Sequence, residues 1–341
     1  MPLLLLLFIS AVLAAQTRAV FYMTPTPGSI RSFLSNAEKI DILIPTFYST
    51  DEQGVVTGPS DSQVLEAARQ SRVPVMPIVA NPGFRQEAVH SLLINPAARA
   101  RFSRSLLEEC RKHNYYGIQL DLENIPASDR DDLTALVKDT AVLLAGEGFR
   151  FSIAAMYPMP DSVLPPGSYS QWLQANWLGA YDLPEIARHV EFISVMTYDQ
   201  HTERTPPGPV AGFRWVEQVL EHCRKTVPAD KLSLGIPLYG RRWYAGTLGG
   251  QGAPLTATVN ASEAVELASS MKLSPQWDAL ERAPWFWFYR HGVREYVFYN
   301  DAKSFRERYQ LAREARLHSF SAWVLGAEDE QIWAELSAAR R

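Results

Sequence analysis

Two carboxylates stand two residues apart in the largely apolar segment YYGIQLDLENIP, residues 115–126. If this segment is a β-strand, its side chains alternate between two faces, and Gln119, Asp121 and Glu123 share one of them. The opposite face is apolar and carries Ile118, Leu120 and Leu122. An ionised carboxylate in apolar surroundings is costly unless it is paired, hydrogen-bonded or used in a reaction. The pair therefore indicates an acid–base site. The alternative is that both residues cap a neighbouring helix or pair with an arginine.

Eight apolar runs are spread along the chain, and helical patterns lie between most of them. Strands that are apolar on both faces and alternate with helices predict a parallel sheet. Eight such units favour an α/β fold closed into a (β/α)8 barrel, in which catalytic groups lie at the carboxyl ends of the strands. Asp121 and Glu123 come at such an end. The expected strands are residues 19–23, 40–48, 73–80, 116–123, 150–157, 191–199, 231–240 and 319–326.

Two segments depart from this alternation. Residues 157–177 are rich in Pro, Ser and Gly, and we expect a long loop over the mouth of the barrel. Residues 244–299 contain two aromatic runs around His291-Gly292, a pattern typical of a β-hairpin. We therefore expect a small α+β insertion between strands seven and eight. Residues 128–146 predict a helix, with Ser128 as its N-cap and Asp131 as the partner three residues on.

The composition favours an uncharged or mixed substrate. The 33 Lys and Arg residues against 37 Asp and Glu residues give a net charge of -4, which offers no general attraction to nucleic acid or to an anionic membrane. The 47% of hydrophobic residues are sufficient for one large core, and we expect a monomer. Nine Trp and fourteen Tyr residues suit stacking on sugar rings, although aromatic residues more often belong to a core.

The amino-terminal residues predict export. Residues 3–14 form an apolar run that is too short to span a bilayer and is followed by small residues. This pattern predicts a signal peptide over residues 1–15 and a secreted or periplasmic domain over residues 18–341. Because no Lys or Arg follows Met1, a buried first strand is the alternative. No other segment approaches 18 apolar residues, so we expect no membrane span after removal of the signal.

Cys110 and Cys223 lie on the apolar stripes of two helical patterns. In the barrel these helices follow strands three and six, far apart around the ring, so we expect both thiols to be free. No His and Cys residues have the spacing of metal ligands. We therefore expect neither a metal nor a cofactor.

Four segments, in order, resemble motifs of family 18 glycoside hydrolases, the chitinase-like (β/α)8 enzymes. YGIQLDLE resembles the Asp-Gly-x-Asp-x-Asp-x-Glu signature of strand four, and FISVMTYD resembles the Met-x-Tyr-Asp motif of strand six. LGIPLYGRRW is similar to the strand-seven motif, and FSAWVLGAED to the strand-eight segment that carries a Trp. The resemblance covers essentially the whole mature chain. It implies a retaining glycosidase that hydrolyses β-1,4-linked N-acetylglucosamine-containing glycans by substrate-assisted catalysis.

The resemblance also implies a role for each matching residue. Glu123 matches the general acid, Asp121 the carboxylate that orients the substrate's N-acetyl group, and Tyr198 the tyrosine that hydrogen-bonds the same group. The other matches are substrate-binding positions: Met196 and Asp199 in the strand-six motif, Tyr239 and Arg241 in strand seven, Tyr22 in strand one, and Trp323 as the floor of the sugar subsite beside the cleaved bond.

The sequence departs from the family pattern at Tyr116 and Gln119, which stand where the first two acidic residues would be. We also expect Gln119 among the substrate-binding residues. Since Gln119 removes a like charge from beside Asp121, that carboxylate should be held by neutral hydrogen bonds. Asn124 stands where chitin-degrading members of the family often have Tyr. Together with the sequence DLENIP, it resembles bacterial branches that act on cell-wall glycans more than typical chitinases. The sequence does not distinguish chitin from peptidoglycan, or internal from terminal cleavage.

Two other classes of function are open. One is a structural or inhibitor-type barrel, which would retain neither the acid nor the aromatic floor. The other is an inactive or weakly active chitinase-like carbohydrate-binding protein. Such proteins usually lose the acid, so the presence of Glu123 favours the hydrolase.

Overall fold

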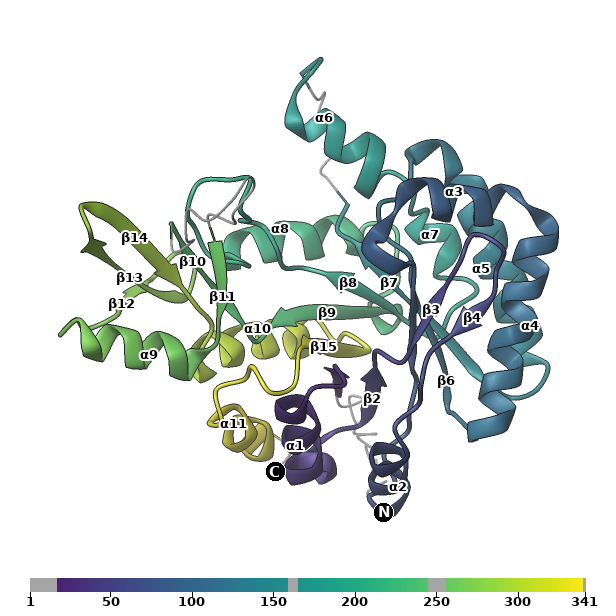
Figure 1. Cartoon of the computed structure of the whole chain (residues 1–341), viewed down its shortest axis with the longest axis horizontal. Helices are drawn as coiled ribbons and strands as arrows, with labels where there is room; N and C mark the ends of the chain where they lie inside the picture. The colour runs from purple at the N-terminus through teal and green to yellow at the C-terminus, as the bar shows by residue number, and fades with distance from the viewer. Residues whose placement is uncertain (1–16, 159–164, 245–255, 340–341) are drawn as a thin grey trace, which may run out of the picture.

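The computed structural model describes residues 17–158, 165–244 and 256–339 (Figure 1). The expected signal peptide lies outside these residues. The main sheet has ten strands in the order β2-β1-β15-β9-β8-β7-β6-β5-β3-β4, and all neighbours except β3 and β4 are parallel. Its strands are β1 (Arg18–Met23), β2 (Ile42–Pro45), β3 (Tyr48–Thr50), β4 (Val56–Thr57), β5 (Ile78–Ala80), β6 (Gly117–Asp121), β7 (Arg150–Met156), β8 (Ile193–Met196), β9 (Leu232–Pro237) and β15 (Ser319–Trp323).

The sheet closes on itself through the second predicted strand, which is divided into β2 and β3. β2 pairs with β1, whereas β3 pairs with β5. Between the two pairings, Leu43 N donates to Pro74 O and Met76 N donates to Leu43 O, both over 2.9 Å. Because both ends of the parallel order belong to one stretch of chain, the structure is a (β/α)8 barrel. The predicted fold class is confirmed.

Side chains alternate between the inside of the barrel and the surrounding helices. In β1, Val20 and Tyr22 belong to an inner cluster, whereas Phe21 packs in the outer core. In β6, Ile118 and Leu120 pack outward, as the sequence predicts. The helices outside the insertion are α1 (Pro27–Asn36), α2 (Ser62–Gln70), α3 (Gln86–Ile94), α4 (Pro96–His113), α5 (Arg130–Ala145), α6 (Tyr169–Leu173), α7 (Leu183–Ile186), α8 (Phe213–Arg224), α10 (Ala302–Glu314) and α11 (Ile332–Ala339).

The two cysteines lie where the sequence places them. Cys110 on α4 and Cys223 on α8 are buried in the outer core, and both are free thiols. Within the described ranges, no helix is both long and apolar enough to cross a membrane.

The start of α5 differs from the prediction. Residues Ala127–Asp129 form a 3₁₀ turn, and Asp129 rather than Ser128 stands at the N-cap. Ser128 Oγ donates to Asp129 Oδ1 over 3.1 Å, so the predicted cap is wrong. The reason is tertiary, because His90 of α3 lies 2.7 Å from Asp129 Oδ2 and fixes that carboxylate in the turn.

Small polar side chains fill the barrel below its mouth. Gln119 Nε2 donates to Ser152 Oγ over 3.1 Å and to Ser194 Oγ over 3.2 Å. Ser194 Oγ lies 2.8 Å from Ser321 Oγ, which also contacts Ser233 Oγ. These residues come from five strands. They form a hydrogen-bonded layer that supports the larger residues at the mouth.

A second sheet forms the insertion between β9 and β15, as predicted. Its strand order is β11-β10-β14-β13-β12, and α9 packs on one of its faces. The turn at His291 and Gly292 has φ values of 50° and 78°, the left-handed pair that a tight hairpin turn requires. Residues 245–255 of the expected insertion lie outside the described residues. The elements are β10 (Gly240–Trp243), β11 (Thr256–Val259), α9 (Ala261–Ser270), β12 (Gln276–Asp278), β13 (Ala283–Arg290) and β14 (Val293–Phe298).

Candidate active site

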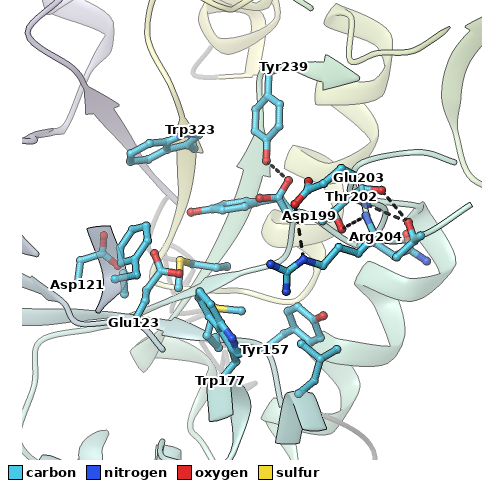
Figure 2. A pocket seen from close by; sticks show the side chains of 18 of the residues that line it. Asp121, Glu123, Tyr157, Trp177, Asp199, Thr202, Glu203, Arg204, Tyr239 and Trp323 are labelled. Atoms are coloured by element: carbon cyan, nitrogen blue, oxygen red, sulfur yellow. Dashed lines mark hydrogen bonds and ion pairs between the residues drawn. The ribbon is translucent and has the colours of Figure 1, made fainter. Parts of the chain in front are cut away.

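A cavity of about 410 Å³ opens at the carboxyl ends of the barrel strands (Figure 2). Most of the predicted site residues line it. Gln119 instead lies in the serine layer of the barrel interior, and Arg241 contacts the lining residues Asp199 and Glu203. The predicted residues in the lining are Tyr22, Asp121, Glu123, Met196, Tyr198, Asp199, Tyr239 and Trp323.

The two carboxylates of β6 and its end are poorly solvated. Burial raises the pKa of Asp121 to about 7. The pKa of Glu123 is raised well above its usual value, first by burial of its carboxyl group and then by the negative charges of Asp121 and Asp199. These added charges favour the protonated form of Glu123. The site can therefore hold a neutral acid at Glu123 beside a group, Asp121, that ionises near neutrality.

The backbone of Glu123 is held by a side chain that the sequence did not point to. Asn81, which follows β5, accepts from Glu123 N over 2.9 Å and donates to Glu123 O over 3.0 Å. Tyr181 Oη donates to the preceding carbonyl, Leu122 O, over 2.7 Å. Asn124 then turns the chain away with a φ of 56°, a left-handed conformation in which Asn is enriched. Glu123 is thus fixed from both sides.

Asp199 anchors a polar cluster on the opposite wall of the cavity (Figure 2). Its Oδ1 accepts from Tyr239 Oη and from Arg241 Nη2, each over 2.7 Å. Arg241 Nη1 also lies 3.7 Å from Glu203. Because Arg241 is shared between two carboxylates, it fixes the strand-seven wall.

Three buried polar atoms in the cavity wall or just below it have no hydrogen-bond partner among the described residues: Asp121 Oδ1, Gln119 Oε1 and Tyr22 Oη. The neutral hydrogen bonds expected for Asp121 are therefore not found at Oδ1. Gln119 directs its amide N–H groups to the serine layer instead, because Ser152 and Ser194 lie within reach. A buried acceptor without a donor is rare in folded proteins and is compatible with a site that gains its partner on ligand binding.

Aromatic side chains form a further part of the wall. Trp323 lies with its ring centroid 5.2 Å from that of Tyr22. Facing it across the cavity, Tyr157 and Trp177 come from the chain that follows β7 (Figure 2). The sequence predicts a loop over the mouth at residues 157–177 but does not assign its aromatic residues to the site. The number of aromatic residues in this segment is the sequence signal that could have assigned them to the site. The lining residues not predicted are Ile78, Phe84, Ala154, Met156, Tyr157, Tyr169, Trp172, Leu173, Trp177, Gln200, Thr202, Glu203, Arg204 and Thr205.

The described part of the chain contains no group of three or more His, Cys, Asp or Glu side chains that could hold a metal ion. The arrangement supplies instead an acid, a nearby ionisable carboxylate and an aromatic floor. This combination can protonate a leaving oxygen and stabilise positive charge beside a flat ring.

Comparison with known proteins gives a consistent result. Residues 18–328 match the profile "Glycosyl hydrolases family 18". The chain is 26% identical over 294 residues to the cortical fragment-lytic enzyme of Bacillus subtilis (strain 168), a match that covers 85% of this chain and 65% of that protein.

Solved structures show the same fold. The spore cortex-lytic enzyme SleL of Bacillus megaterium QM B1551 aligns with a TM-score of 0.82 and 23% identity, covering 94% of this chain and 73% of that one. A chitinase from Chromobacterium violaceum ATCC 12472 aligns with a TM-score of 0.84 and 21% identity, covering 95% of this chain and 99% of that one.

Proposed function

The chain belongs to glycosyl hydrolases family 18 and is a glycoside hydrolase, and we propose that it cleaves β-1,4-linked N-acetylglucosamine-containing glycans with retention by substrate-assisted catalysis. The observation that carries this proposal is the environment of Glu123. Its carboxyl group lies in the cavity, its backbone is fixed by Asn81, and burial and two nearby negative charges raise its pKa. Such a carboxyl group is suited to general acid catalysis near neutral pH.

In the first step Glu123 donates its proton to the glycosidic oxygen while the bond from that oxygen to the anomeric carbon breaks. The carbonyl oxygen of the substrate's own acetamido group forms a bond to the same carbon and gives an oxazolinium-like intermediate. In the second step water attacks the anomeric carbon, the acetamido oxygen leaves, and the water proton returns to Glu123. Two displacements retain the configuration. Family 18 enzymes are an exception to the two-carboxylate scheme for this reason.

Asp121 and Tyr198 serve the acetamido group. An ionised Asp121 faces the positive charge that develops on the amide, and its Oδ1 has no donor among the described residues. The substrate N–H can supply that donor. Tyr198 lines the same cavity and offers a hydroxyl to the acetamido group. Trp323 provides the surface on which the sugar ring packs, since aromatic faces suit the apolar faces of pyranoses.

The substrate class rests on the family and on its members. One relative is named as a cortical fragment-lytic enzyme and one structural neighbour as a chitinase. Both names are compatible with a polymer of N-acetylhexosamines. Digestion of a panel of chitin and peptidoglycan fragments, followed by mass analysis of the products, identifies the polymer and the position of cleavage.

The apolar run at residues 3–14 supports the further proposal that the enzyme acts outside the cytoplasm. Amino-terminal sequencing of the exported protein tests it.

The mechanism is tested with substrates that differ only at carbon 2. The N-acetyl oligosaccharide should be hydrolysed, whereas analogues with a free amine or a hydroxyl group should be nearly inert. A thiazoline that mimics the cyclised intermediate should inhibit, because enzymes bind the transition-state shape more tightly than the substrate. Efficient cleavage of the amine or hydroxyl analogue, or a glycosyl ester trapped on an Asp or Glu, contradicts substrate assistance. A carbohydrate-binding protein without activity would bind the N-acetyl oligosaccharide and leave it intact.

A further inference from the structure

The small sheet of the insertion presents two different faces. α9 covers one face, where Phe286, Phe288 and Val297 pack against Ala264 and Ala268. In Figure 1, α9 lies below this sheet. The opposite face carries an aromatic set that we call the insertion aromatic face: Trp285, Trp287, Tyr289, Tyr296, Phe298 and Arg294.

Strand register places these residues on one side. Trp285 is opposite Phe298, Trp287 is opposite Tyr296, and Tyr289 is opposite Arg294. Residues that face each other across an antiparallel pair point to the same side, and so do residues two apart along a strand. The rows therefore form one ladder that runs for about 13 Å along β13 toward its hairpin.

The outer rows of this ladder are accessible. Trp287 is 38% exposed and Tyr289 is 58% exposed, which are large fractions for aromatic side chains. Their rings are 5.7 Å apart at an interplanar angle of 86°. Arg294 contacts both rings: its guanidinium carbon lies 4.7 Å from the Trp287 ring centroid and 5.2 Å from that of Tyr289. Arg294 Nη2 also donates to Tyr289 Oη over 2.7 Å. Two rings and a cation thus contact one another on an exposed surface.

The inner end of the same face pairs with β10, and residues of β10 contact the wall of the cavity. Phe298 is opposite Arg241 of β10, and Tyr296 is opposite Trp243. Arg241 is bonded to Asp199 in the cavity wall. Trp243 Nε1 donates over 3.4 Å to the carbonyl oxygen of Thr202, which also lines the cavity. The aromatic ladder therefore begins one strand away from the cavity wall and continues away from the cavity.

We propose that the insertion aromatic face binds the same N-acetylhexosamine polymer at sugar units distant from the cleaved bond. This inference rests on the proposed function. Trp287 and Tyr289 present flat apolar surfaces that suit the C–H faces of pyranose rings, and Arg294 supplies N–H donors for hydroxyl or acetamido oxygens. Continuity with the cavity favours a polysaccharide over another macromolecule, because one extended chain can occupy both places. Short oligosaccharides occupy only the cavity.

The experiment compares the intact chain with the double variant Trp287→Ala/Tyr289→Ala. Both are measured in the Glu123→Gln background for retention on insoluble chitin and on purified peptidoglycan, so that turnover does not remove the polymer. The double variant should be retained about tenfold less tightly on the polymer that the enzyme degrades, since each aromatic contact contributes a few-fold in affinity. With Glu123 restored, it should keep kcat/KM on a short fluorogenic N-acetylglucosamine oligomer.

Val142→Ala and Val265→Ala, at positions 67% and 50% exposed, are the matched controls and should change neither quantity.

Equal retention of parent and double variant overturns the proposal, and so does a parent that neither polymer retains. A double variant that keeps its thermal midpoint but loses oligomer turnover also overturns it, because the face would then belong to the catalytic subsite. If the double variant unfolds, the two single variants are measured instead. A protein that dimerises through this face, seen as a mass change abolished by the double variant, contradicts a glycan occupant. Failure of the proposed function is separate, since it appears as no hydrolysis of any N-acetyl substrate by the wild type.

Discussion

Asn81 should be a positioning residue for the catalytic acid, and its replacement gives the sharpest test of the site. Asn81 is 2% exposed and makes two hydrogen bonds to the backbone of Glu123, at 2.9 and 3.0 Å. Asn81→Ala removes both. A neutral hydrogen bond contributes about 1 kcal/mol, and a buried group left without its partner costs about 1–3 kcal/mol. The variant should therefore be less stable by roughly 2–4 kcal/mol, a loss that a domain stable by about 5–15 kcal/mol tolerates.

The kinetic effect should be larger than the loss of stability suggests. A displacement of about 1 Å at a catalytic group can lower the rate by about a hundredfold. We expect kcat of Asn81→Ala to fall by about ten- to a hundredfold with KM little changed, because Trp323 and the other aromatic residues of the cavity wall are untouched. Steady-state kinetics on a fluorogenic oligomer, together with thermal unfolding, measure both quantities.

Thr140→Val is the control for the loss of a buried hydrogen bond away from the cavity. Thr140 Oγ1 lies 2.8 Å from Ser103 Oγ between α4 and α5, and both residues are buried outside the cavity lining. This variant should lose about 1 kcal/mol of stability and keep its kcat. If Asn81→Ala is folded and turns over substrate as fast as the wild type, the two hydrogen bonds do not position the acid and the reasoning is refuted.

Three further variants test the neighbouring groups. Glu123→Gln should keep sugar binding but lose at least about a hundredfold in turnover, the usual contribution of a general acid, and a folded variant with normal turnover removes Glu123 from that role. Asp199→Asn deletes a negative charge that raises the pKa of Glu123, so the alkaline limb of the pH–rate profile should move to lower pH; an unmoved limb contradicts the electrostatic account. Gly235→Ala places a Cβ 2.5 Å from Val195 O and 3.0 Å from Tyr198 Cε1, so both kcat and the thermal midpoint should fall. Wild-type values of both would show that the end of β8 accommodates the methyl group.

The barrel and the strand-borne residues could be predicted because they depend on local periodicity. Alternation along residues 116–123 is sufficient to place Asp121 on the inner face and Leu120 on the outer one, and the structure has both there. The division of the second strand into β2 and β3 could not be predicted. This division follows from the closure of the sheet. Leu43 of β2 forms a parallel bridge with Val75, whereas β3 pairs with β5.

The supporting residues were missed for a related reason. Asn81 and Tyr181 act on the backbone of residues 122 and 123, and each is about 40 to 60 positions away in sequence. An Asn after a strand is an ordinary turn residue, so its type alone carries no catalytic signal. The prediction of a loop over residues 157–177 is wrong for its second half, where the chain forms α6 (Tyr169–Leu173) and a π-helical turn (Gln174–Leu178). The direction of the aromatic side chains in this segment depends on tertiary contacts such as that between Tyr157 and Trp215.

The substitution at position 119 gives the site a particular distribution of charge. A carboxylate there would compete with Asp121 for a proton, whereas the Gln119 amide is neutral and is held by Ser152 and Ser194. The negative charges that raise the pKa of Glu123 are those of Asp121 and Asp199. When Asp121 ionises, it therefore favours retention of the proton on Glu123, where the leaving oxygen requires it. Asp121 Oδ1 has no donor among the described residues, which is costly in the free enzyme; under the proposed mechanism, binding of an acetamido N–H would relieve that cost only for substrates that carry the group. The same atom would thus contribute both to catalysis and to the selection of N-acetyl sugars.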